Sequence, residues 1–137
     1  MKKRIITLTL FLAPFLLNAQ AKDYKVVFDL TSGDTVDHKS VLRWFNEILK
    51  ETPSAKLEIV FYGQSLGMVV KDRSIAPDAI MKLASNPNLT FKVCSIAMGR
   101  HNIDKSQLLV GVQTVPDGIY EIISKQKEGW GYIKVSH

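Results

Sequence analysis

The 137-residue sequence contains a single cysteine, Cys94, and this scarcity excludes several kinds of protein. One thiol cannot form an intrachain disulfide, and together with the three histidines it shows no ligand spacing of a metal site; we place His38 at the surface. The sequence also lacks a glycine-rich phosphate loop of the Walker or dinucleotide-binding type, and no paired carboxylates indicate general acid–base catalysis. We therefore expect no metal and no other cofactor, and a conventional hydrolase or oxidoreductase has little support.

The first 21 residues have the pattern of a secretory signal peptide. Residues 2–4 are basic, residues 5–17 are an apolar run, and residues 19–21 (AQA) form a small-x-small cleavage site. The apolar run is shorter than the roughly 20 residues that a membrane span needs. We predict cleavage after Ala21, a periplasmic or secreted protein without membrane attachment, and one mature domain over residues 22–137; an uncleaved anchor is the alternative.

A strong excess of positive charge is missing from the expected mature chain. The whole sequence has 18 basic and 13 acidic residues, a net charge of +5, but residues 2–4 supply three of the basic ones. Residues 22–137 therefore carry 15 basic and 13 acidic residues, a net charge of +2. No run of basic residues with interleaved aromatic side chains occurs, so we do not expect nucleic acid as a partner.

Apolar, β-branched segments alternate with segments of helical periodicity along the mature chain. The predicted strands are residues 24–30, 56–62, 89–93, 109–115 and 130–135. The predicted helices are residues 36–51, 78–85 and 95–101, and a last helix that Pro116 and Asp117 open and Gly129 ends. This alternation predicts an α/β fold, a three-layer α/β/α sandwich with a five-stranded, mainly parallel sheet.

Two stretches decide how the layers pack. We expect residues 63–67 to form a flexible connection, and the apolar residues 66–70 to belong either to the core or to an oligomer interface or lid. In the last helix, we expect Ile119, Ile122 and Ile123 to form the stripe that faces the sheet.

Cys94 lies where a predicted strand ends and a predicted helix begins. Ligands of open parallel sheets bind at the carboxyl ends of the strands. Unpaired N–H groups at a helix N-terminus favour the thiolate, which is the nucleophilic form of cysteine. We therefore predict Cys94 as the catalytic residue, beside a substrate pocket of Gly63, Gln64, Ser65 and Ser95. The alternative is a buried structural cysteine, because free cysteine is among the most buried residue types.

Arg100 and His101 follow Cys94 by six and seven residues. On a continuous helix this separation is nearly two turns, about 9 to 10 Å. Neither side chain is therefore expected to deprotonate Cys94 directly unless the helix breaks first, for which Gly99 offers a place. We expect both to be solvated residues at a helix end.

Loose motifs of small and apolar residues surround the cysteine and recur towards the C-terminus. They are Val93-Cys94 with Ala97-Met98-Gly99 and Asn102-Ile103, Val112-x-x-Val115-Pro116-x-Gly118, and Gly129-x-Gly131-Tyr132-Ile133-Lys134. In this order they resemble the DsrE/DsrF-like family, which includes the YchN-like and TusD-like sulfur-relay proteins. The resemblance covers residues 24–135.

The resemblance implies a DsrE-like α/β/α fold with a five-stranded parallel sheet, and homo- or hetero-oligomers, often trimers or hexamers; for this chain we expect a homo-oligomer. It also implies that a cysteine accepts sulfane sulfur as a persulfide and passes it to a partner thiol. The matching cysteine is Cys94, and Gly63 matches a glycine of the neighbouring loop. Relay members of the family are cytoplasmic, whereas this sequence has an export pattern, so their partners are not expected here.

Two hypotheses of function follow. In the first, the protein is an exported sulfur carrier that holds a persulfide on Cys94, with a thiol or sulfane-sulfur compound as its partner. In the second, it is a non-catalytic oligomeric binding or scaffold protein in which Cys94 is a buried structural residue.

Overall fold

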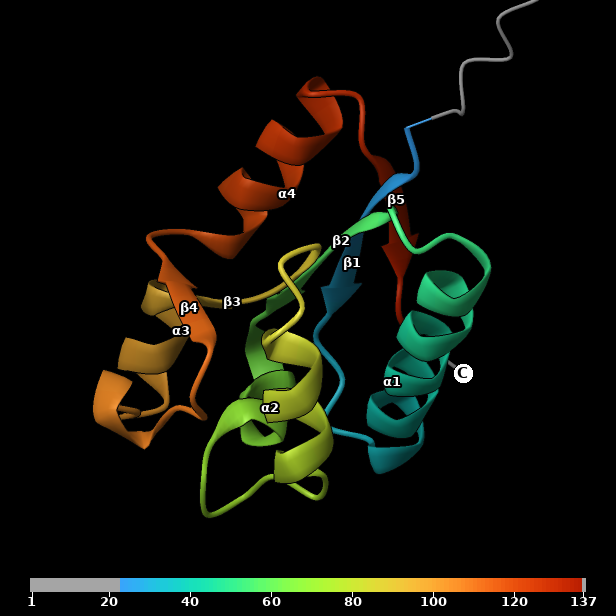
Figure 1. Cartoon of the computed structure of the whole chain (residues 1–137). Coiled ribbons are helices and arrows are strands. Elements are labelled where there is room, and N and C mark those ends of the chain that lie inside the picture. The colour runs from blue at the N-terminus through green and yellow to red at the C-terminus, as the bar shows by residue number, and fades with distance from the viewer. Residues whose placement is uncertain (1–22, 137) are drawn as a thin grey trace, which may run out of the picture.

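Five strands alternate with helices in the computed structural model, which describes residues 23–136 (Figure 1). The strands are β1 (Lys25–Leu30), β2 (Lys56–Phe61), β3 (Leu89–Cys94), β4 (Val112–Val115) and β5 (Gly131–Lys134). The helices are α1 (Thr35–Glu51), α2 (Pro77–Ala84), α3 (Ser95–Arg100) and α4 (Gly118–Lys127), with 3₁₀-helices η1 (Gly63–Val69) and η2 (Lys105–Gln107). The predicted signal peptide, residues 1–21, lies outside the described residues.

The strands form one parallel sheet in the order β4-β3-β2-β1-β5. The chain moves in one direction from β1 to β4 and then returns past β1 to add β5. Because crossover connections between parallel strands are right-handed, this reversal places α4 on the face opposite to α1 and α2 (Figure 1). The predicted three-layer α/β/α sandwich with a five-stranded parallel sheet is confirmed.

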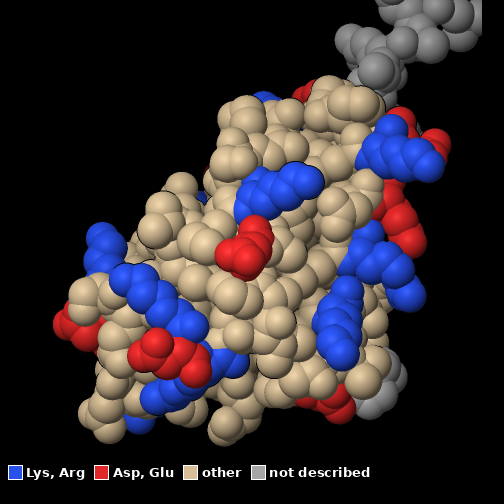
Figure 2. Space-filling view, turned by 60° about the horizontal axis from the view of Figure 1, so that its bottom comes forward, with Lys and Arg blue, Asp and Glu red and all other residues tan. Residues whose placement is uncertain are grey.

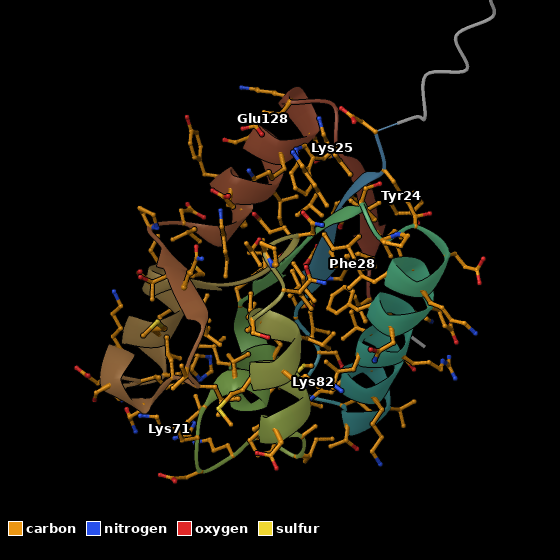
Figure 3. The ribbon with its side chains drawn as sticks, in the orientation of Figure 1. Tyr24, Lys25, Phe28, Lys71, Lys82 and Glu128 are labelled. Atoms are coloured by element: carbon orange, nitrogen blue, oxygen red, sulfur yellow. The ribbon has the colours of Figure 1, made fainter. Side chains whose placement is uncertain are left out.

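Four phenylalanines form the centre of the larger core, between the sheet and α1. Phe28 packs edge-on against Phe45 with ring centroids 4.9 Å apart, and Phe45 meets Phe91 edge-on at 6.0 Å. Phe61 stacks on Phe91 at 6.0 Å. Figure 3 shows Phe28 between β1 and α1. Each such pair stabilises the fold by about 0.5–1.5 kcal/mol beyond the area that it buries, so the rings fix three central strands against α1.

The opposite face has much less apolar cover. Here α4 packs through a small cluster of Val27, Val60 and Ile122. Ile119 and Ile123 are 58% and 44% exposed, so the predicted three-residue inner stripe of this helix was wrong at two positions. The helix meets the sheet along a narrow line, and only Ile122 of the three points inward.

A buried charge network supplements this small cluster. The Lys92 ammonium lies 3.0 Å from Glu58 Oε2 and 2.7 Å from Glu121 Oε1. Lys125 Nζ lies 3.9 Å from Glu58 Oε2, and the Thr90 hydroxyl donates to the same oxygen at 3.1 Å. Burial raises the pKa of Glu58 above its usual 4.5. Although burial acts in the same direction on Glu121, its hydrogen bond with Lys92 lowers the pKa of that carboxyl.

The segment after β2 is ordered rather than flexible. Residues 63–69 form η1, whose Leu66, Met68 and Val69 are buried together with Val70. The Ser65 hydroxyl, also fully buried, lies 2.6 Å from the Leu30 carbonyl oxygen and 2.9 Å from that of Tyr62. The expected flexible connection was therefore wrong, and of the two readings of residues 66–70, membership of the core is confirmed.

Two further expectations need correction. The fourth strand begins at Val112 and not at residue 109, because Gly111 takes a left-handed φ of 89° and Val110 is exposed to solvent. His38 is buried rather than on the surface, since its Nε2 lies 2.9 Å from the Ser32 carbonyl oxygen. That contact ties the first turn of α1 back to the loop after β1.

Charge on the surface is mixed. On the face drawn in Figure 2, basic and acidic side chains are interspersed and much of the area between them is uncharged. No helix among the described residues is long and apolar enough to cross a membrane.

Candidate functional site

Cys94 lies at a corner between two elements. It is the last residue of β3, where it pairs with Val115 of β4, and its extended backbone (φ −67°, ψ 117°) is the N-cap of α3. Its side chain makes no capping hydrogen bond. The residue is only 6% exposed, so a reagent can reach the thiol only through a cavity.

Such a cavity, of about 260 Å³, lies at the carboxyl edge of the sheet. It is bounded by the ends of β2 and β3, by α3 and by the start of α4. Its lining residues are Tyr62, Gly63, Cys94, Ile96, Ala97, Arg100, His101, Asp117 and Ile119. The volume lies near the lower limit of small-molecule sites, which favours a ligand of a few heavy atoms.

Gly118 lets α4 approach the cysteine closely. A Cβ atom at this position would lie 3.1 Å from Cys94 Cβ and 3.0 Å from Val60 Cγ1, which is tighter than ordinary side-chain contact. The preceding residue, Asp117, caps the helix, because its Oδ1 accepts from the N–H of Ile119 at 2.9 Å. Asp117 and Ile119, on either side of Gly118, thus form one wall of the cavity.

Besides Tyr62 and the thiol, the ionisable side chains of the cavity wall are Arg100, His101 and Asp117. Arg100 is exposed and His101 is half-buried, and neither side chain forms a hydrogen bond or ion pair with another residue of the range 23–136. The carboxylate of Asp117 is occupied by the N-terminus of α4. The lining therefore has one full cation without an ionic partner, Arg100, while the Asp117 carboxylate is held at the positive end of a helix.

Tyr62 connects the cavity to a second polar cluster. Asp29 accepts hydrogen bonds from the Tyr132 hydroxyl at 2.7 Å and from Lys134 Nζ at 3.1 Å, and Lys134 Nζ lies 5.7 Å from the Tyr62 ring centre. Burial, with the nearby Asp29 carboxylate, raises the pKa of Tyr62, and the hydrogen bond to Asp29 raises the pKa of Tyr132 to about 12. Tyr62 is thus a neutral phenol at physiological pH and a poor base.

The predicted site residues do not all gather at the cavity. Gly63 and Cys94 line it. Gln64 and Ser95 are exposed outside its lining, and Ser65 is buried in the core with its hydroxyl bonded to backbone carbonyls. Within residues 23–136, no three or more His, Cys, Asp or Glu side chains are placed to hold a metal ion.

Sequence reasoning missed the contribution of α4. The carboxyl end of the fourth strand reaches the same edge as Cys94, and Asp117 and Ile119 follow it directly. The rule that sites lie at strand ends could have identified them. Arg100, the last residue of α3, and His101, its C-cap, lie at a helix end as expected, and both also line the cavity.

Comparison with known proteins places the fold. A sequence profile of the DsrE/DsrF-like family matches residues 25–135. A comparison with curated protein sequences finds no match. A protein of unknown function, MTH1491 of Methanobacterium thermoautotrophicum, superposes with a TM-score of 0.77 at 27% identity, covering 82% of this chain and 99% of that one. The ychN protein of E. coli superposes with a TM-score of 0.68, covering 80% and 97%; its 12% identity supports the shared fold alone.

Proposed function

The chain belongs to the DsrE/DsrF-like family, and from this premise we propose that it is a sulfur carrier that holds a persulfide on Cys94. The observation that carries the proposal is the thiol itself, 6% exposed at the wall of a cavity of about 260 Å³. Burial shields a bound persulfide from solvent and from chance collision with other thiols, and the cavity leaves room for one further sulfur atom.

The proposed chemistry is two exchanges at sulfur. The Cys94 thiolate attacks the sulfane sulfur of a donor R–S–S⁻, forms Cys94–S–S⁻ and releases R–S⁻ with the electron pair of the broken S–S bond. In the second exchange, an acceptor thiolate attacks the outer sulfur and restores the Cys94 thiolate. Neither step consumes an oxidant or a reductant, so one cysteine is sufficient.

The test of this proposal is mass spectrometry after incubation with polysulfide. We expect the wild-type chain to gain about 32 Da, the mass of one sulfur atom, on the peptide that contains Cys94. The Cys94→Ser variant should gain nothing, and an acceptor thiol added afterwards should remove the gain. If Cys94→Ser takes up the same mass, the assignment of the sulfur to Cys94 is wrong.

We also propose that the protein acts as a homo-oligomer, a trimer or hexamer. Ile119, Tyr120 and Ile123 lie on the outer side of α4 and are 58%, 68% and 44% exposed, which leaves an apolar strip beside the cavity mouth. A second copy that covers this strip would shield both the strip and the cavity mouth. Light scattering should give a mass of three or six chains, and Ile123→Lys should lower it to that of a monomer; a wild-type monomer would refute this part.

Export is a further part of the proposal. The pattern of residues 1–21 supports a signal peptide, and removal of that segment leaves a chain that begins at Lys22. N-terminal sequencing of the protein from a periplasmic or culture-medium fraction should therefore begin at Lys22. Full-length protein in the cytoplasmic fraction would contradict this location.

The deep burial of Cys94 also favours a second candidate, a non-catalytic oligomeric binding protein with a structural cysteine. Titration of the native protein with a thiol reagent separates the two candidates. A Cys94 that reacts only after denaturation supports the structural role and excludes sulfur exchange through the cavity.

A further inference from the structure

We infer that the Cys94 cavity selects small sulfur donors that carry an anionic group, and that Arg100 and His101 set this preference. The inference rests on the proposed sulfur-carrier function and adds a substrate class to it. The shared chemistry is a sulfane sulfur at one end of the donor and a negative charge at the other. Thiosulfate and a carboxylate-bearing persulfide of low molecular mass both have this form.

The first support is the balance of charge around the thiol. Arg100 and the neighbouring His101 reach the cavity from α3 and its end, and neither has a hydrogen-bonding or ionic partner among the described residues. Asp117 is the one acidic residue of the lining, and its carboxylate already accepts from two backbone N–H groups of α4. Arg100 therefore carries a full positive charge without an ionic partner, while the negative charge of Asp117 is stabilised at the positive end of α4.

The groups behind the cavity do not alter this balance. Tyr62 is neutral because its pKa is raised by burial and by the Asp29 carboxylate. Asp29 itself accepts from the Tyr132 hydroxyl and from Lys134, and Lys134 also donates to the Thr31 hydroxyl oxygen at 2.7 Å. These charges satisfy one another, which leaves Arg100 as the cation open to a ligand and His101 beside it as a further hydrogen-bonding group.

The second support is the distribution of polar and apolar lining. Ile96, Ala97 and Ile119 contribute apolar walls to a cavity of about 260 Å³. Sulfur is polarisable and weakly hydrated, so it suits such walls, whereas a carboxylate or sulfonate requires cationic donors. A donor with its sulfur towards Cys94 and its anion towards Arg100 satisfies both requirements.

The exchange with each donor balances in atoms and charge. Thiosulfate reacts as Cys94–S⁻ + S–SO₃²⁻ → Cys94–S–S⁻ + SO₃²⁻, in which the S–S bond of the donor breaks and sulfite leaves with the electron pair. A persulfide donor R–S–S⁻ reacts in the same way and releases R–S⁻. In both cases, Arg100 faces an anion before and after the bond breaks, so it acts as a specificity-determining residue and not as an acid or base.

The decisive experiment compares the rates at which iodoacetate and iodoacetamide alkylate Cys94. The two reagents share the reacting carbon and differ in charge, and both require the thiolate, so their rate ratio cancels any change in the pKa of Cys94. We expect the ratio of iodoacetate to iodoacetamide to be higher in native than in denatured wild-type protein. Arg100→Gln should lower the native ratio by roughly fivefold, the upper range for a solvent-exposed ion pair, and His101→Gln by less.

Lys105→Gln is the matched control, because it removes the same charge from a residue outside the cavity lining. Three outcomes would each overturn the inference. The ratio of the iodoacetate and iodoacetamide rates could be the same in native and denatured wild-type protein, it could be unchanged in Arg100→Gln, or it could fall equally in Lys105→Gln. A thiol that reacts with neither reagent before denaturation overturns both the inference and the proposed function.

Sulfur loading then separates the two proposals and the two donor types. If the alkylation ratio behaves as expected but no donor adds sulfur to Cys94, the anion-selective cavity stands and the carrier function fails. If sulfur is added, the second-order rates with thiosulfate and with cysteine persulfide identify the preferred donor. Arg100→Gln should slow the preferred donor by the same roughly fivefold factor. Its reaction with the neutral dimethyl trisulfide, Cys94–S⁻ + CH3–S–S–S–CH3 → Cys94–S–S–S–CH3 + CH3–S⁻, should keep the wild-type rate; an equal loss with this neutral reagent would contradict charge selection.

Discussion

Substitution of Lys92 by methionine tests whether charge, rather than apolar packing, holds α4 on the sheet. Methionine nearly preserves the volume and the unbranched shape of lysine but removes the ammonium. The change leaves Glu58, whose side chain is 3% exposed, with Lys125 at 3.9 Å as its nearest cation. Because Glu58 Oε1 already lacks a hydrogen-bond partner, the carboxylate would be almost uncompensated.

The expected loss of stability follows from this burial. Removing one partner of a buried ion pair costs about 3–5 kcal/mol, and Lys125 remains nearby, so we expect about 3 kcal/mol at pH 8 for Lys92→Met. For a domain of this size, that corresponds to a fall in Tm of roughly 12 °C. Lys39→Met, at an exposed position of α1, is the control and should change stability by less than about 0.5 kcal/mol.

The pH dependence of the loss has a definite sign. Burial already raises the pKa of Glu58 above 4.5, and removal of Lys92 raises it further. The folded variant then binds a proton more tightly than the unfolded chain, so its stability increases as the pH falls through the folded pKa of Glu58 towards 4.5. The deficit relative to wild type should therefore be largest at pH 8 and clearly smaller at pH 5.

Urea denaturation at pH 8 and pH 5 provides the measurement, followed by circular dichroism and tryptophan fluorescence. Trp130 is a useful probe because Lys125 Nζ lies 4.9 Å from its ring centre, at the end of α4. Adding Glu58→Gln to Lys92→Met should recover about 2 kcal/mol, since the buried charge is then absent. A loss below about 1 kcal/mol at pH 8, or one that is equal at both pH values, would refute this account of the network.

Three further substitutions test the site and its supports. Gly118→Val should lower the rate of thiol alkylation at least tenfold, because the new side chain occupies space beside the thiol. Gly99→Ala should leave the rate unchanged, because a Cβ atom at this position meets nothing within 4 Å. Equal rates in the two variants would contradict the proposed close approach of α4 to Cys94. Ser65→Ala should cost about 1–2 kcal/mol in urea denaturation by removing the hydroxyl donor from two buried carbonyls. A neutral result would show that the backbone N–H groups of Tyr62 and Ser65, which already bond these carbonyls, satisfy them without the hydroxyl. Asp117→Ala should lower the free energy of unfolding by about 1 kcal/mol, because α4 loses its N-cap, whereas Asp117→Asn should retain most of the stability. Equal losses of stability in the two variants would indicate a role of Asp117 beyond capping.

The order of elements was predictable because it depends on local patterns. Apolar runs such as residues 56–62 and 89–93 are too short and too β-branched for helices, and the 36–51 stripe has helical spacing. Alternation of the two then restricts the topology to parallel crossovers, which the sheet confirms. Errors arose where local patterns do not fix the environment: Ile119 and Ile123 are apolar but exposed, and His38 is polar but buried.

The cavity was predictable only in part. Cys94 and Gly63 were identified because both lie at the carboxyl ends of strands that reach the same edge of the sheet. Asp117 and Ile119 were not identified. They lie at least 23 positions after Cys94 in the sequence, and only the return of the chain through α4 brings them close to the thiol. Ser65 was predicted to line the pocket because it follows Gly63 and Gln64 at a strand end. The turn of η1 instead directs its hydroxyl into the core.

The sequence by itself determined the α/β class, the parallel sheet, the family and the one residue with nucleophilic chemistry, because these depend on periodicity, on motif order and on the presence of a single thiol. The tertiary structure decided what surrounds that thiol. The reversal of the chain after β4 carries α4 to the opposite face, and Gly118 allows it to lie directly against Cys94. The packing of α3 beside the end of β3 puts Arg100 on the wall of the same cavity. Proximity of this kind depends on how the elements pack, and no local pattern encodes it.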